Sequence, residues 1–315
     1  MTALAYLFTF LKNAIYGTTY FFINGLNEDI DAIDILALRF LLSFVVLWLL
    51  KTTRLIKINV GLKDVFKKTD KHQFILPLFL AALFSPVIEM FFETTGSTMT
   101  TAVTAGVIIS LMPVASCVFE GIILKEGTTL LQKIFLALGI IGVIYIAINI
   151  RPDDENARDT IWGIVCLVIA VIAGPLYLVF SRRSSGKFKP LEITYFSCLL
   201  GMIVFNSISV IKHLWQGTIK HYFDPYFNPK NILLFFALSI VCTIFCTLMN
   251  NFCMSRLQAS TVAAFGGVST IVTILFGVIK GEDLYPFHYI GFTLILIRMV
   301  GVSYIAIKKD KNHYS

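Results

Sequence analysis

Charged residues are scarce in this chain, and their scarcity excludes an ordinary soluble fold. Asp, Glu, Lys and Arg make up 14% of the 315 residues, hydrophobic residues make up 57%, and the mean hydropathy is +0.81. A soluble domain carries about 25% charged and about 45–50% apolar residues. This apolar excess is too large for a soluble core, and it indicates a surface that faces a lipid bilayer.

Several chemical motifs are also missing. The chain has no G-x-x-x-x-G-K-[ST] loop, which leaves direct ATP coupling without support, and no H-E-x-x-H motif. Its five histidines fall in loops or at the ends of apolar segments, and no pair of aspartates lies inside one. An enzyme embedded in the membrane is therefore not expected, and neither is a cofactor.

Cysteine and positive charge have ordinary explanations. The six cysteines all fall inside apolar segments, where they act as small hydrophobic residues and predict neither a disulfide framework nor a metal site. The net charge of +7 comes from Lys and Arg in short loops between apolar runs. Membrane topology explains such loops, so nucleic acid is not an expected partner. Lys12 and the lack of an A-x-A site argue against a cleaved signal peptide at the N-terminus.

Ten apolar stretches have about the 20 residues that a helix needs to cross a bilayer. Placing both termini in the cytoplasm puts the large majority of loop lysines and arginines inside, as the positive-inside rule requires. Lys-, Ile-, Phe- and Asn-rich usage and the absence of N-x-[ST] sequons favour a bacterial plasma membrane. The predicted spans are 3–23, 32–50, 74–95, 100–124, 129–149, 161–181, 190–211, 231–254, 258–279 and 286–307.

The second half of the chain repeats the first. "GVIYIAI" at 142–148 recurs as "GVSYIAI" at 301–307, and at a nearly constant separation Asp34 corresponds to Glu192 and Gly17 to Gly174. Each half holds five predicted spans, and an odd number makes the second half enter the membrane from the opposite side. We therefore expect an all-α membrane protein built from two inverted five-helix repeats, 1–150 and 151–315, an architecture typical of secondary transporters.

Three segments resemble a known family. "IYGTTYFF", "DILALRFLLSF" and "TTAVTAGVIISLMPVASCVFEGIILKEGTT" are similar to the first, second and fourth helices of the EamA-type branch of the drug/metabolite transporter superfamily. The resemblance implies ten helices around a central cavity that binds a small-molecule substrate. It names no substrate, because relatives handle chemically diverse solutes. The second half departs from the pattern, with Ser269 in place of a proline and Ser197 in place of the counterpart of Arg39.

Charged side chains inside predicted spans are the first candidates for the binding site, since each costs about 2.5–3.5 kcal/mol to insert. Glu89 and Glu93 lie one turn apart on one helix face and resist ionising together, which suits proton-linked release of a cationic substrate. Pairing of Glu89 with Arg39 is the structural alternative. Lys12 is expected to face the cavity, to reach the membrane surface, or to pair with Glu120, which lies close enough to the inner surface to be solvated. Arg298 favours a structural ion pair.

Polar uncharged residues complete the predicted cavity. Tyr16 and Tyr20 lie about one turn apart, and Tyr177 is the counterpart of Tyr20 in the second half. Asparagine is costly in lipid, so at least one of Asn250 and its neighbour Asn251 should face the cavity or another helix. The substrate-binding residues predicted from the sequence are Lys12, Tyr16, Tyr20, Arg39, Glu89, Glu93, Thr101, Thr104, Tyr177 and Asn250.

The sequence thus favours a secondary transporter, and specifically an exporter of a small polar metabolite such as an amino acid or an amine. A passive channel and a lipid flippase remain the alternatives, which counterflow and a lateral polar groove would distinguish from a carrier. The lipid bilayer and a small-molecule substrate are the expected partners, and a monomer or weak homodimer is the expected state. The aromatic residues of 212–230 resemble an interfacial belt.

Overall fold

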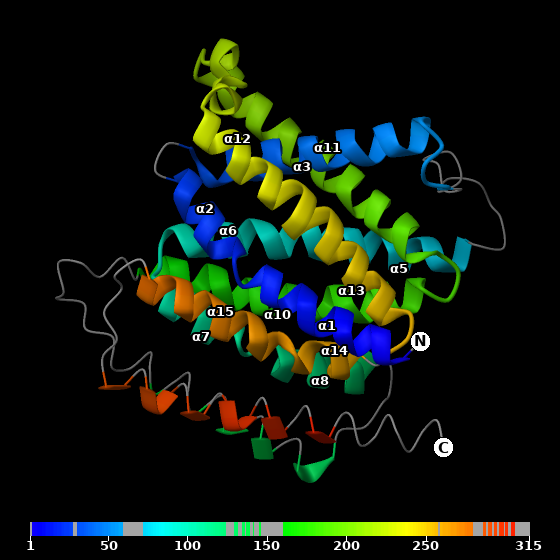
Figure 1. Ribbon diagram of the computed structural model, residues 1–315, viewed down its shortest axis with the longest axis vertical. Helices are drawn as coiled ribbons and strands as arrows, with labels where there is room; N and C mark the ends of the chain where they lie inside the picture. Colours follow the sequence, from blue (N-terminus) through cyan, green and yellow to red (C-terminus); the bar gives the residue numbers. More distant parts are fainter. Residues whose placement is uncertain are drawn as a thin grey trace.

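The computed structural model describes residues 2–27, 30–58, 72–123, 160–257 and 259–279, with separate residues between 129 and 145 and between 286 and 305. All regular secondary structure in these ranges is helical, as Figure 1 shows. Helices are expected because backbone groups in hydrocarbon must find their hydrogen-bond partners within their own segment.

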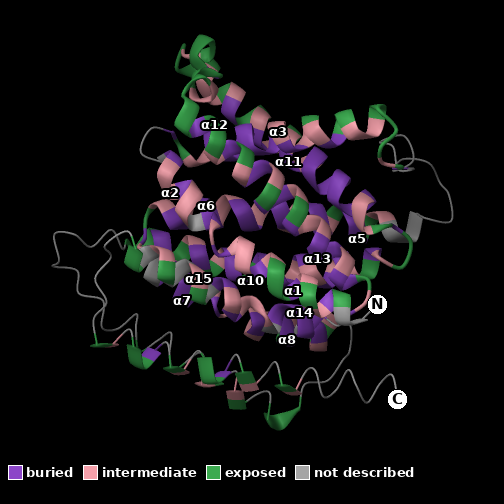
Figure 2. Ribbon diagram, viewed as in Figure 1, coloured by how far each residue is buried: buried purple, intermediate pink, exposed green. Residues whose placement is uncertain are grey.

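Six helical stretches within the described ranges are long and apolar enough to cross a membrane, and they confirm six of the ten predicted spans. Their outward surfaces carry large apolar side chains, so that exposed and buried residues alternate over the outer helices (Figure 2). Such a surface is unfavourable in water and suits lipid. The six stretches are Ala32–Thr52, Ile75–Thr98, Thr104–Ile123, Ile161–Ser184, Pro190–Trp215 and Pro229–Met254.

Three of these stretches are single helices and three are composite. The single helices are α3 (Ala32–Thr52), α10 (Ile161–Ser184) and α11 (Pro190–Trp215). The composite stretches join α5 (His72–Ala82), η1 (Leu83–Ile88) and α6 (Glu89–Thr98); α7 (Ala102–Ile109) and α8 (Met112–Ile123); and α12 (Pro229–Phe236), η4 (Ala237–Phe245) and α13 (Cys246–Met254).

The composite stretch of α5, η1 and α6 is kinked where its sequence requires it. In η1, a π-helical segment, Ser85 has the non-helical dihedrals φ −141° and ψ 119° directly before Pro86. Proline has no backbone N–H and clashes with the preceding turn, so it kinks the helix. Glu89 begins α6 immediately after this kink.

Two predicted spans are each divided into two shorter helices. Residues 3–23 form α1 (Thr2–Tyr16) and the first part of α2 (Thr19–Asn27), and 258–279 form α14 (Ala259–Ala264) and α15 (Gly266–Ile279). The first break falls at Gly17, where a Cβ would come within 2.6 Å of both Ser269 O and Val272 Cβ of α15. Only glycine allows the two helices to approach this closely.

The predicted spans 129–149 and 286–307 lie largely outside the described residues. Their described pieces run along one side of the bundle in Figure 1. Phe135 packs beside Cys117 of α8, and a Cβ at Gly301 would overlap the Phe135 ring. These two stretches are therefore neighbours of each other and of α8.

The packing of helices follows a regular scheme. α3 packs against α11, α7 against α15, and α8 against α14. α1 packs against α13 and α15, whereas α10 packs against α6, α7 and α8. Hydrogen bonds and ion pairs reinforce the α3–α11 contact, because Lys212 Nζ lies 2.6 Å from Asp34 Oδ2 and Asn206 Nδ2 donates to Ala37 O at 3.0 Å.

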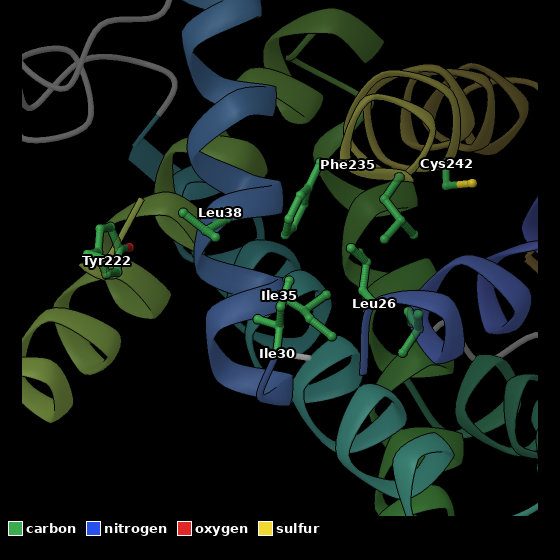
Figure 3. Close-up of a cluster of buried hydrophobic side chains, with 9 residues drawn as sticks. Leu26, Ile30, Ile35, Leu38, Tyr222, Phe235 and Cys242 are labelled. Atoms are coloured by element: carbon green, nitrogen blue, oxygen red, sulfur yellow. The ribbon is translucent and has the colours of Figure 1, made fainter. Parts of the chain in front are cut away.

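A buried apolar cluster holds one end of the bundle together (Figure 3). It joins α2, α3, α12, η4 and the loop that contains η2 (Ile219–His221) and η3 (Asp224–Phe227). Labelled members of this cluster in Figure 3 are Leu26, Ile30, Ile35, Leu38, Tyr222, Phe235 and Cys242.

The aromatic residues of this loop have two different placements. Trp215, Phe223 and Phe227 are exposed, as an interfacial belt would require. Tyr222 is buried instead and donates a hydrogen bond to Asn206 Oδ1 at 2.6 Å, and Tyr226 donates to Leu38 O at 2.6 Å. Burial raises the pKa of Tyr222 to about 12, so its hydroxyl keeps its proton at physiological pH.

Candidate functional site

The two carboxylates of α6 are buried without a cationic partner among the described residues. Glu89 and Glu93 are each 8% exposed, and no ion pair to a lysine or arginine is formed by either within the described ranges. Ser85 hydrogen-bonds Glu89, and the Tyr16 hydroxyl lies 3.2 Å from Glu93 Oε2, to which it donates. The sequence prediction that both carboxylates lie together on one face is consistent with this arrangement.

The Glu89 side chain packs closely against a glycine of α10, in the second half of the chain. A Cβ at Gly174 of α10 would overlap the Glu89 carboxylate and lie 3.2 Å from Met112 Cε. In the repeat predicted from the sequence, Gly174 corresponds to Gly17, and Gly17 allows α15 to approach the junction of α1 and α2. Gly17 and Gly174 thus both permit close contact between helices from different halves of the chain.

Arg39 is buried but is not the partner of Glu89. Its Nε donates to Thr243 Oγ1 of η4 at 2.5 Å, and its Cζ lies 5.9 Å from the centre of the Phe40 ring. The second terminal nitrogen has no hydrogen-bond partner in the described structure. The expected Arg39–Glu89 pair is therefore not formed, and Arg39 instead fixes α3 against η4.

Lys12 anchors a chain of hydrogen bonds through four helices. Its ammonium donates to Asn250 Oδ1 at 2.7 Å, and Asn250 Nδ2 lies 3.3 Å from the Tyr177 hydroxyl. Tyr177 donates to Asn251 Oδ1 at 2.8 Å, and Asn251 Nδ2 donates to Thr194 Oγ1 at 3.0 Å. The expectation that at least one of the two asparagines faces another helix is confirmed.

A small cavity of about 20 Å³ lies beside Glu93. Its polar wall consists of Tyr16, Thr19, Glu93, Ser97 and Ser269, and apolar residues of α2 and α7 close the remainder. A volume of this size is enough for about one water-sized group. Because Ser269 belongs to α15, both halves of the chain contribute to the wall.

Other predicted site residues have different surroundings. Thr101 precedes α7 as its N-cap, where Oγ1 accepts from Thr104 N at 3.2 Å, and the two hydroxyls are 3.1 Å apart. Neither threonine lines the cavity beside Glu93, so their role in binding stays a prediction. The side chain of Tyr20 lies outside the described part of the structure.

Thr19 and Ser97 of the cavity wall were not predicted from the sequence. Each follows a predicted site residue by about one helical turn, Thr19 after Tyr16 and Ser97 after Glu93. Residues three and four apart share a helix face. Extending the face of Glu93 by one turn would have identified Ser97, whereas the break at Gly17 separates Tyr16 in α1 from Thr19 in α2.

Two sequence predictions about charged residues are wrong. Glu120 was expected to be solvated, but it is 2% exposed and accepts from Arg182 Nη1 at 2.9 Å and from Ala259 N at 3.0 Å. Arg298 was expected in an ion pair, but it is 1% exposed and its guanidinium nitrogens have no hydrogen-bond partner in the described structure. The loop after α13 brings the start of α14 onto Glu120, a contact that linear spacing does not reveal.

Comparison with known proteins identifies the family. The model of the EamA-like transporter family matches residues 3–148 and 161–304. The chain is 30% identical over 308 residues to the "Uncharacterized transporter YcxC" of Bacillus subtilis (strain 168), an alignment that covers 98% of this chain and 95% of that protein.

More distant similarities agree with this assignment. An "Uncharacterized transporter" of Archaeoglobus fulgidus is 24% identical over 139 residues, which cover 44% of this chain and 48% of that protein. A solved structure described as "Crystal structure of protein" has the same fold, with a TM-score of 0.65 at 15% identity and coverage of 97% of this chain and 98% of that chain. These matches indicate a transporter rather than an enzyme. This multi-pass membrane protein therefore belongs to the EamA-like transporter family.

Proposed function

We propose that this protein is a secondary transporter that exports a small polar metabolite, such as an amino acid or an amine, by alternating access. The observation that carries the proposal is the pair of buried carboxylates, Glu89 and Glu93, which have no cationic side chain as a direct partner in the described structure. Two neighbouring carboxylates in a low-dielectric site resist ionising together, and a bound cation or a proton relieves their repulsion. A transported cation meets this requirement.

The proposed architecture is ten spans in two inverted repeats, 1–150 and 151–315. In this scheme α10 is the counterpart of α1, and the span that contains α6 is the counterpart of the span that contains α13. Both equivalent contacts are present, because α1 packs against α13 and α10 packs against α6. α3 packs against its counterpart α11, and the span of α7 and α8 packs against its counterpart, the span of α14 and α15. A pseudo-two-fold axis in the membrane plane would produce this scheme, and transporters of this kind bind substrate at the repeat interface.

Lys12 supplies the opposite charge in the same region. Lys12 and Glu89 are close enough to interact electrostatically, and within the described structure the ammonium makes one side-chain hydrogen bond, to Asn250. An ammonium has three donors, so capacity remains for a substrate group such as a carboxylate. This supports an amphoteric or cationic solute.

Alternating access requires that one end of the cavity closes when the other opens. The ion pair between Glu120 and Arg182 joins α8 to α10, and Glu120 also accepts from the N–H of Ala259 in α14. Roughly 17 Å of helix rise separates it from Ile109 in the cavity wall. With both termini in the cytoplasm, this contact closes the cytoplasmic end while the cavity lies toward the outside.

The test is counterflow with protein in liposomes, using substrates identified by a shift in melting temperature. The purified protein is screened with amino acids, amines, organic anions and nucleotide sugars, because a ligand at 100 times its Kd stabilises by about 2.7 kcal/mol. A carrier takes up labelled substrate faster when unlabelled substrate is inside the liposome.

Glu89→Gln and Glu93→Gln should abolish this exchange. Glu192→Gln is the matched control, because Glu192 is also buried but receives the Lys189 N–H at the start of α11. Uptake that does not respond to internal substrate would indicate a passive channel, and stabilisation by lipids alone would indicate a flippase. Either result contradicts the proposal.

A further inference from the structure

We infer that the cavity beside Glu93 is the subsite for a primary ammonium group of the substrate. The inference rests on the proposed function, since it assigns a chemical group to one part of the same site. The wall of the cavity contains one carboxylate, that of Glu93, and no basic residue. It also contains four hydroxyl-bearing side chains, those of Tyr16, Thr19, Ser97 and Ser269. Arg39 acts electrostatically on Glu93 from outside the wall. The composition of the wall itself disfavours an anionic group and favours a cation.

Thr19 provides an independent indication that the cavity holds a ligand. Its side chain is 4% exposed and lines the cavity, yet its hydroxyl has no hydrogen-bond partner within the described structure. Buried hydroxyls are normally paired, because a hydroxyl without a partner loses its hydrogen bonds to water and gains none. A polar group in the cavity would supply the missing partner.

The directions of the neighbouring hydrogen bonds indicate whether the bound group must donate or accept hydrogen bonds. The Tyr16 hydroxyl donates to Glu93 Oε2, and Ser269 Oγ donates to Gly266 O at 2.6 Å. Their protons are committed, so both oxygens present acceptor lone pairs to the cavity. The Glu93 carboxylate also only accepts when ionised. The site therefore requires a donor, and an –NH₃⁺ group has three donors and no acceptor.

The size of the cavity limits substitution on the nitrogen. A space of about 20 Å³ accepts a group close to a water molecule in size. A trimethylammonium group is much larger, and its methyl groups can make no hydrogen bond to the carboxylate or to the hydroxyls. The subsite should therefore select primary amines over fully methylated ones.

The test measures binding to the purified full-length protein with butylamine, butyltrimethylammonium, butyrate and sodium chloride as probes. Butylamine should raise the melting temperature, and the other three should not. Thr19→Val should weaken butylamine binding about tenfold to a hundredfold, as expected for a lost hydrogen bond to a charged group. Its melting temperature without ligand should not fall, because the hydroxyl that it removes has no partner in the described structure.

Thr9→Val is the matched control. Thr9 is a buried threonine of α1 whose hydroxyl donates to Ala5 O at 2.7 Å, and it does not line the cavity. This variant should bind butylamine as the parent protein does. Glu93→Gln should lose binding of butylamine without gaining binding of butyltrimethylammonium.

Four results would overturn the inference: no response to butylamine, equal binding of butyltrimethylammonium, equal butylamine affinity in Thr19→Val and Thr9→Val, or stabilisation by sodium that butylamine cannot increase. Failure of the inference is distinguishable from failure of the proposed function. Counterflow that persists while Thr19→Val binds normally rejects only the subsite. Thr19-dependent binding without counterflow supports the subsite and rejects transport.

Discussion

Breaking the Glu120–Arg182 ion pair should destabilise the protein by about 1–3 kcal/mol. The oxygen and nitrogen are 2.9 Å apart, and the side chains are 3% and 26% exposed, respectively. Exposed pairs contribute about 0.2–1 kcal/mol, and removing one partner of a fully buried pair costs about 3–5 kcal/mol. Partial exposure of Arg182 places the expected value between these limits.

A double-mutant cycle isolates this contribution. Glu120→Gln, Arg182→Gln and the double variant are unfolded in mixed micelles of a mild detergent and SDS, and their free energies of unfolding are compared with the parent. Glutamine at 120 keeps an oxygen for the Ala259 N–H, so the cycle measures the loss of charge. A coupling energy of about 1–3 kcal/mol is expected, because these residues touch directly.

A coupling energy near zero would refute the reasoning, because the pair would then contribute nothing to closure of this end. The same variants have a functional readout. Cysteines introduced between α8 and α14 can be labelled with a membrane-impermeant thiol reagent applied from the cytoplasmic side. If the contact closes the cytoplasmic end, Glu120→Gln should increase this labelling. Unchanged labelling would argue that other contacts close this end.

Three further predictions concern residues elsewhere. Lys12→Met should leave Asn250 without its donor and abolish counterflow of a zwitterionic substrate; retained counterflow would contradict a role for the ammonium. Arg298→Met should not lower the melting temperature, because the guanidinium has no partner in the described structure; a clear decrease would reveal one. Tyr222→Phe should lose about 1 kcal/mol of stability with the hydrogen bond to Asn206. Since burial raises the pKa of Tyr222 from 10.0 to about 12, this contribution is fully present below pH 10 and is lost as pH rises through 12. The stability advantage of the parent over Tyr222→Phe should therefore be larger at pH 8 than at pH 12.

The positions of the helices could be predicted because lipid imposes a simple rule on the chain. The stretch 161–181 is apolar and forms most of α10, and 190–211 forms most of α11. The interruptions inside spans were harder to predict. Gly17 and Thr18 continue an apolar pattern, and only the approach of Val272 from α15 explains why glycine is required there.

The candidate site was predictable where a single helix carries it. Glu89 and Glu93 share a face by spacing alone, and this needs no knowledge of the fold. The environment of Glu120 depends on α10 and α14, which are distant in sequence, so its partner Arg182 could not be inferred from the pattern. Thr19 was missed for a related reason: it begins α2 after the break at Gly17, and only the packed structure shows that its hydroxyl has no partner among the described residues.

The hydrogen-bond chain from Lys12 to Thr194 has one direction throughout. Lys12 donates to Asn250, Asn250 to Tyr177, Tyr177 to Asn251 and Asn251 to Thr194, so each member donates forward and accepts from behind. Bonds aligned in this way polarise and strengthen one another. Withdrawing the ammonium of Lys12 would weaken every later bond in the series. A substrate carboxylate that attracts Lys12 would therefore loosen α10, α11 and α13 together, and binding at one helix would be transmitted to three others.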